Sequence, residues 1–187
     1  MEKIKFIIFI FLFLFVIIKP ATADSVAGSS ATIISSNKGI EDLRNSQSDL
    51  YLQKRAIKKI LEKYQSPMID SVDVFISACQ KYELDCYLLP SIATLESTLG
   101  RFIYPDSFNA FGWGGGYIMF ENWDQGINTV AKGLRKNYLN KGAVSIEEIG
   151  PIYSESSTWA QRVQSIKKMF EKVEKEQLYL SQVSVEL

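Results

Sequence analysis

Apolar residues recur at every third or fourth position along most of the chain, which is the period of an amphipathic helix. Six stretches carry this pattern: residues 41–65, 71–82, 88–99, 124–139, 145–150 and 157–178. Helix-ending signals follow some of them, with Pro67 after the first and Gly100 after the third. Asp124 is expected to cap the fourth, and Ser145 with Glu148 forms a capping-box signature for the fifth, which is expected to end at residues 150–151. The pattern predicts a mostly α-helical fold with about six helices.

Residues 101–123 break the helical period. They hold four glycines and eight aromatic residues, which is over a third of the segment, against 12% aromatic residues in the whole chain. Residues 117–120 are expected to form a short strand or one half of a hairpin. Sugars stack their apolar C–H faces on aromatic rings, so Trp113 and Tyr117, beside the glycines, are the expected exposed platform. The phenylalanines are expected to fill a small core instead: Phe102, Phe108 and Phe120.

The first 23 residues have the three zones of a secretory signal. Lys3 and Lys5 precede an apolar run over residues 6–18, and Ala21-Thr22-Ala23 provides small residues for a cut after Ala23. The alternative is an uncleaved anchor, which would be the chain's only link to a membrane. Residues 24–40 are Ser- and Ala-rich and are expected to form a flexible linker before a domain over residues 41–180. Whether the signal is cleaved or retained as an anchor, the domain is expected to be exported, to the extracellular space, the cell wall or the periplasm.

Composition narrows the chemistry. The chain has no histidine, which excludes Ser-His-Asp and Cys-His catalysis and argues against a zinc hydrolase. The 21 basic and 21 acidic residues balance, so no global basic field favours nucleic-acid binding. Acid–base chemistry near neutral pH must therefore come from carboxylates, tyrosine, lysine or cysteine.

Two cysteines, Cys79 and Cys86, stand seven positions apart. Export places them in an oxidising compartment, where a disulfide closing a short loop between two helices is one expectation. The other is two small core residues on different helices.

Glu96 is the single acid in an apolar stretch from Leu88 to Phe102. On a helix it shares a face with Ile92, Ala93 and Leu99, so its side chain is expected to be buried. Burial and the nearby helix C-terminus both favour the protonated carboxyl, as a general acid for a glycosidic oxygen requires. The alternative is a glutamate that turns out to solvent at a fraying helix end.

Four segments together resemble a known family: LPSIATLESTLGRF, FNAFGWG, WDQGINTVAKGLRKNYL and IYSESSTWAQRVQSI. They are similar to the mannosyl-glycoprotein endo-β-N-acetylglucosaminidase-like domain, glycoside hydrolase family 73 of the lysozyme-like superfamily. Its members show an E-S-x-x-G signature at a helix end, then N-x-F-G, then a Y-A-T-D-like turn before the last helix. The resemblance covers about residues 50–175.

The resemblance implies a lysozyme-like helical domain that cleaves β-1,4 linkages of peptidoglycan, of the N-acetylglucosaminidase type, without metal or cofactor. The expected partner is peptidoglycan or another N-acetylglucosamine-containing glycan. Glu96 falls on the general acid, and Ser97 completes its signature. The N-x-F-G match, Asn109, Phe111 and Gly112, is expected to line the cleft. Tyr153 is expected to face the cleft within hydrogen-bond distance of Glu96 or of the bound sugar.

Two departures from the family pattern leave the second catalytic group open. Only about ten residues separate Gly112 from Trp123, so the short aromatic segment stands in place of a larger β-lobe. The turn after Tyr153 reads Ser-Glu-Ser where the family has Ala-Thr-Asp. The carboxylates available in or beside the segment are Asp106, Glu121 and Asp124. A substrate-assisted or tyrosine-assisted route, an intramolecular closure, and a module that binds glycan without cutting it are the alternatives.

Overall fold

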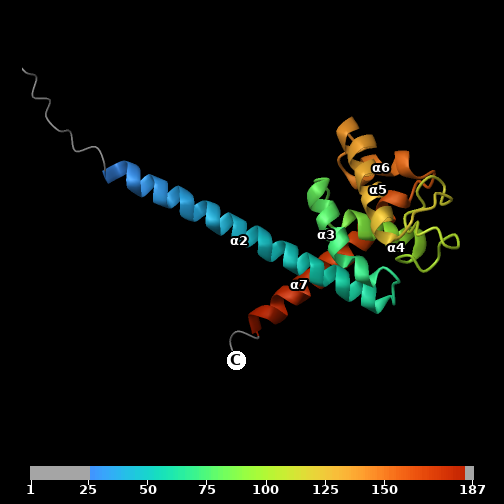
Figure 1. The fold of residues 1–187 in the computed structure, drawn as a ribbon, viewed down its shortest axis with the longest axis horizontal. Helices are drawn as coiled ribbons and strands as arrows, with labels where there is room; N and C mark the ends of the chain where they lie inside the picture. The colour runs from blue at the N-terminus through green and yellow to red at the C-terminus, as the bar shows by residue number, and fades with distance from the viewer. Residues whose placement is uncertain (1–25, 184–187) are drawn as a thin grey trace, which may run out of the picture. The chain divides into compact units, whose positions relative to one another are not determined.

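Helices dominate the computed structural model, which describes residues 26–183. The chain divides into two compact units between Leu43 and Arg44. The helices are α2 (Val26–Lys63), η1 (Ile69–Ser71), α3 (Val72–Lys81), α4 (Leu88–Ser97), α5 (Trp123–Asn137), η2 (Leu139–Lys141), α6 (Ile146–Tyr153) and α7 (Trp159–Val183) (Figure 1). The prediction of a mostly α-helical fold is confirmed.

The N-terminal predictions meet the structure only in part. The proposed signal over residues 1–23 lies outside the described residues. The linker prediction is wrong in its secondary structure, because α2 already begins at Val26 and covers most of residues 24–40. That stretch contains no proline, and extending an existing helix requires no new nucleation, so weak helix formers can continue it.

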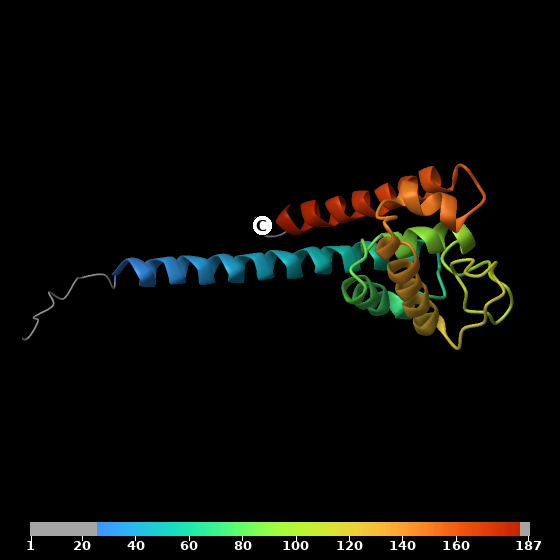
Figure 2. The ribbon, with the colours of Figure 1, turned by 90° about the horizontal axis from the view of Figure 1, so that it is seen from above.

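The core of the described residues from 44 to 183 is arranged around α4. This helix is apolar on nearly every side, which is the pattern of a fully buried helix, and Leu89, Ile92 and Ala93 are inaccessible to solvent. It packs against α7 and α3, while α3 packs on α5 and α6 on α7 (Figures 1 and 2). The other helices contribute apolar side chains to the same core, as Ile57 and Ile60 of α2 illustrate. Burial of these apolar side chains stabilises the fold around α4.

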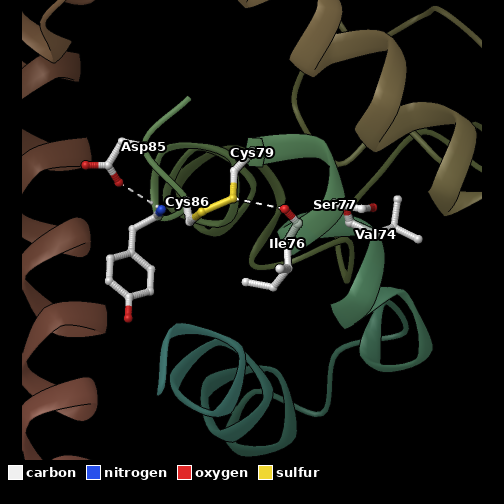
Figure 3. The surroundings of a disulfide bond; sticks show 7 residues. Val74, Ile76, Ser77, Cys79, Asp85 and Cys86 are labelled. Atoms are coloured by element: carbon white, nitrogen blue, oxygen red, sulfur yellow. Dashed lines mark hydrogen bonds between the residues drawn. A yellow bond between two sulfur atoms is a disulfide. The ribbon is translucent and has the colours of Figure 1, made fainter. Parts of the chain in front are cut away.

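The start of α4 is tied to α3 by a disulfide between Cys79 and Cys86 (Figure 3). Of the two expectations for these residues, the structure shows the bridge, although Cys79 is also buried in the core. Between them and α4, Asp85 accepts a hydrogen bond from the backbone N–H of Tyr87 at 2.9 Å. The carboxylate of Asp85 also pairs with Lys167 of α7 at 2.7 Å. A covalent bond and an ion pair therefore hold this end of the helix.

The segment between α4 and α5 has no strand in residues 98–122, all of which the structure describes, so the strand prediction for residues 117–120 is wrong. Only the N–H of Phe120 makes a strand-like bond, to the carbonyl of Ser107 at 2.8 Å. Hydrogen bonds from the side chain of Asn109 to backbone groups of the same segment hold the loop together where a strand pair would have used backbone–backbone bonds. Figures 1 and 2 show this yellow-green loop gathered at one end of the helices, beside α4 and α5.

Helix caps follow the sequence in one case and depart from it in two. The capping box of Ser145 and Glu148 is confirmed at the start of α6. The cap of α5 is Asn122, whose side chain accepts from the N–H of Gln125, while Asp124 accepts a hydrogen bond from Ser71 at 2.6 Å. Helix α6 does not end at residues 150–151 but continues through Pro151 to Tyr153, because the N–H of Ser154 still closes its last turn on Gly150.

Candidate functional site

Glu96 lies in the last turn of α4, and its side chain is exposed. The prediction of a buried carboxylate is wrong, although Ile92, Ala93 and Leu99 are all buried. The reason is that the helix ends at Ser97, and the next three residues have left-handed φ values of +53°, +56° and +80°. Leu99 therefore leaves the helical register and reaches the core by the turn. Its burial carries no information about the direction of Glu96.

The two carboxylate oxygens of Glu96 have different surroundings. Oε1 accepts a hydrogen bond of 2.7 Å from the indole N–H of Trp159, the first residue of α7. Oε2 faces the glycine loop, since a Cβ placed on Gly112 would lie 3.1 Å from it. Gly112 has φ +62°, so a side chain there would be both strained and crowded. Three distant segments thus converge on one exposed carboxylate.

An aromatic pocket of ≈ 360 Å³ adjoins this carboxylate on the side of Gly112. Its lining consists of aromatic rings and glycines: Gly112, Trp113, Gly114, Gly115, Tyr138 and Tyr153. The rings of Trp113, Tyr138 and Tyr153 contact one another, with centroids 5.8–6.2 Å apart. The pocket therefore offers flat apolar faces and open glycine backbone beside an acid.

Tyr153, at the end of α6, connects the pocket to Trp159. Its ring stacks on the indole with centroids 4.7 Å apart, and its hydroxyl donates to the carbonyl of Phe111 at 2.7 Å. Burial, with the charge of Glu96 as a smaller contribution, raises the pKa of Tyr153 well above 10. The expected hydrogen bond to Glu96 is replaced by the one to Phe111, so Tyr153 stays neutral and positions its neighbours.

Ser97 is buried and is not among the residues that line the aromatic pocket. Its hydroxyl donates toward the carbonyls of Ala93 at 3.0 Å and Ala110 at 2.7 Å, and it accepts from the N–H of Gly100 at 2.8 Å. The prediction of substrate binding by Ser97 is corrected to a structural role. The side chain joins the end of α4 to the glycine loop.

Asn109 and Phe111 are likewise buried, so the prediction that they contact substrate is corrected. The side-chain amide of Asn109 donates to the carbonyls of Trp113 and Ile118, and its oxygen accepts from the N–H of Trp113. The hydrogen-bonding groups of Asn109 are therefore used within the loop. Phe111 is a core side chain that contributes only its carbonyl, to Tyr153. Both residues shape the loop around Gly112.

The two expected platform residues differ in exposure. Trp113 is half-buried, because its ring packs over Gly133 of α5 as well as lining the pocket. Tyr117 is 75% exposed and meets Tyr104, itself 55% exposed, edge to face at 5.8 Å. The expected exposed platform is therefore found at Tyr117. Among the expected core residues of the loop, Phe120 is buried, whereas Phe102 is 69% exposed.

Two residues of this site were not predicted from the sequence. Tyr138 and Trp159 both fall on the apolar stripes of their helices, where they read as core residues. Trp159 is indeed buried, but the indole N–H is a polar group that needs an acceptor when buried, and this was the signal that could have marked it.

A second pocket, of ≈ 430 Å³, lies between α6 and the start of α7, with Glu147 and Glu155 among its lining residues. Glu96 is a lining residue of neither pocket, and it adjoins the aromatic pocket through Gly112. Within residues 26–183, no group of three or more histidine, cysteine or acidic residues is arranged to hold a metal ion. Over the same range, no helix is both long and apolar enough to cross a membrane.

Comparison with known proteins assigns the chain to no family. No protein-family model matches the chain, and no curated protein matches its sequence.

Proposed function

We propose that this chain is an exported peptidoglycan hydrolase that cleaves β-1,4 linkages of the glycan strand, with Glu96 as the general acid. The observation that carries the proposal is the exposed carboxylate at the end of α4, held by Trp159 on one oxygen and open toward Gly112 on the other. A general acid needs to be fixed in orientation yet reachable by the leaving oxygen, and this arrangement meets both needs. The residue resemblance to family 73 supports the same assignment.

The pocket beside Glu96 supports a sugar substrate. Trp113, Tyr138 and Tyr153 present ring faces on which the C–H face of a pyranose can stack. Gly114 and Gly115 are both exposed, and although the Ile118 side chain lies against Gly114, the backbone at Gly115 is open to hydroxyl and acetamido groups. The chemistry of this lining suits N-acetylated hexose units better than a charged or purely aliphatic ligand.

No carboxylate, Glu96 included, is among the residues that line the aromatic pocket, so the pocket itself offers no second acid to the proposed enzyme. Asp124 is engaged with Ser71, and neither Asp106 nor Glu121, both exposed, lines the pocket with Gly112. This favours a route in which the substrate's own acetamido group or a hydroxyl assists departure of the leaving sugar. Water or that internal group would then complete the reaction at the sugar carbon.

A glycan-binding module without hydrolytic activity is the second candidate. The absence of a carboxylate from the pocket lining favours it, as does the exposed pair of Tyr104 and Tyr117, which suits stacking on a glycan. The two candidates differ at Glu96, because a binding module has no need of an acid held by an indole.

The test is mass spectrometry of the fragments released when the purified protein is incubated with peptidoglycan. Reducing N-acetylglucosamine ends support the proposed glucosaminidase, whereas reducing N-acetylmuramic acid or anhydro ends identify a different bond or an intramolecular closure. Glycan that is bound and sedimented without any released fragment would overturn hydrolysis and leave the binding module. Glu96→Gln is the matched control and should release no fragments.

A further inference from the structure

The indole N–H of Trp159 can donate a hydrogen bond but cannot accept one. It is directed at Oε1 of Glu96 at 2.7 Å, and Trp159 itself is 2% exposed, so the loss of this acceptor would leave a donor of a buried side chain unpaired. Oε1 must therefore remain an acceptor in both protonation states of Glu96. A proton on the carboxyl then belongs on Oε2, the oxygen that faces Gly112.

We propose that Trp159 is a positioning residue that directs the acidic proton of Glu96 to Oε2, toward the aromatic pocket. The location of the proton is independent of activity, while its consequence for catalysis rests on the proposed function. In the reaction, the Oε2–H bond breaks and the proton passes to the glycosidic oxygen. That oxygen keeps the electron pair of the broken C–O bond, and the negative charge left on Glu96 is stabilised by the N–H of Trp159.

Trp159 is held in this orientation by a closed series of contacts. Its ring stacks on Tyr153, the hydroxyl of Tyr153 donates to the carbonyl of Phe111, and Phe111 precedes Gly112, which faces Oε2. The series begins and ends at Glu96. Rotation of the indole away from Oε1 would break the stacking and leave a buried N–H without a partner.

A titratable group beside the bond between Trp159 and Glu96 is Tyr153 of α6, whose pKa is raised well above 10 by burial and, to a smaller extent, by the charge of Glu96. Tyr153 therefore stays neutral over the pH range in which carboxyl groups titrate. The contacts from α7 and from the glycine loop, through Trp159 and Gly112, carry no titratable group.

Nuclear magnetic resonance of the full protein with ¹⁵N-labelled tryptophan tests the bond without any substrate. The chain has three tryptophans, so Trp159→Phe assigns the indole resonance by its disappearance. We expect that resonance to move in one step as Glu96 titrates, and not to move in Glu96→Gln. Tyr153→Phe, which keeps the stacked ring, should retain the step. A Trp159 resonance that does not titrate, or that titrates equally in Glu96→Gln, would overturn the proposal.

The pH–rate profile tests the consequence. Removing a hydrogen bond from the charged carboxylate favours its protonated form, so Trp159→Phe should move the high-pH limb to higher pH. It should also lower kcat about tenfold with KM little changed, because the acid is no longer oriented. Trp123→Phe is the matched control and should leave the profile unchanged. An unchanged profile in Trp159→Phe would overturn the positioning role, whereas a wild-type protein without activity would overturn only the proposed function.

Discussion

The two ends of helix α4 are built on opposite principles. At its start, the Cys79–Cys86 disulfide and the pair of Asp85 with Lys167 fix the chain by a covalent bond and by satisfied charges. At its end, the chain leaves the helix through left-handed residues and presents Glu96 to solvent beside a glycine loop. Strained backbone persists only where the surroundings enforce it. The comparison teaches that one end anchors the helix so that the other can hold an exposed acid in place.

The largest expected effect of any single change lies at the open end. Glu96→Gln should lower the rate of peptidoglycan cleavage by about 10²–10⁴-fold, the scale for losing a general acid. Its thermal unfolding midpoint should stay close to wild type, because the amide oxygen can still accept from Trp159. Lysis assays and thermal unfolding measure the two effects, and a folded Glu96→Gln protein with wild-type turnover would exclude Glu96 as the acid.

At the anchored end, the Cys79→Ala/Cys86→Ala double variant should lose about 2 kcal/mol in the free energy of unfolding, as expected for the short loop this disulfide closes. Urea unfolding with and without reductant measures it, since reductant should destabilise the wild type and leave the variant unchanged. If the wild type purified from an oxidising compartment carried two free thiols per chain, the start of α4 would have no covalent anchor and this part of the comparison would fail.

The glycines of the loop allow a sharper comparison within the open end. Gly112 and Gly116 both have positive φ, +62° and +86°, but only a side chain at Gly112 would meet Glu96. Both alanine variants should lose about 1 kcal/mol of stability from backbone strain. Gly112→Ala should in addition lower activity about tenfold by displacing the carboxylate. Equal activity in the two variants would show that Gly112 matters only for its backbone.

The smallest expected effect concerns the ion pair at the anchored end. Burial lowers the pKa of Lys167, but hydrogen bonds and charges from Asp85 and Glu171 outweigh it and raise the pKa above 10.5. A cation whose pKa rises on folding stabilises the fold fully below 10.5, and this contribution is lost as pH rises through the raised value. Lys167→Met should therefore cost about 0.5–1 kcal/mol at pH 8 and less in strongly alkaline solution.

Urea unfolding of the wild type and Lys167→Met at both pH values measures this difference. A gap between the two proteins that widens with rising pH would have the wrong sign for a raised lysine pKa.

Local patterns in the sequence predicted the helices but not the direction of every side chain. The 3.6-residue period and the Ser145–Glu148 capping box depend on neighbours three or four positions apart, so the sequence alone specifies them. The same period placed Glu96 in the core, because it cannot show that the helix ends one residue later. The strand predicted for residues 117–120 failed for a related reason, since the carbonyl of Ile118, which a partner strand could have used, accepts a hydrogen bond from the side chain of Asn109.

The sequence by itself determined that the fold is helical, that Glu96 stands alone in an apolar stretch, and that an aromatic, glycine-rich segment follows it. Only the tertiary structure decided which groups meet there. Trp159 bonds Glu96 across 63 positions, and Tyr153 bonds Phe111 across 42. The physical reason is that helix patterning is a local property, whereas the partner of a buried indole N–H depends on how α7 packs against α4.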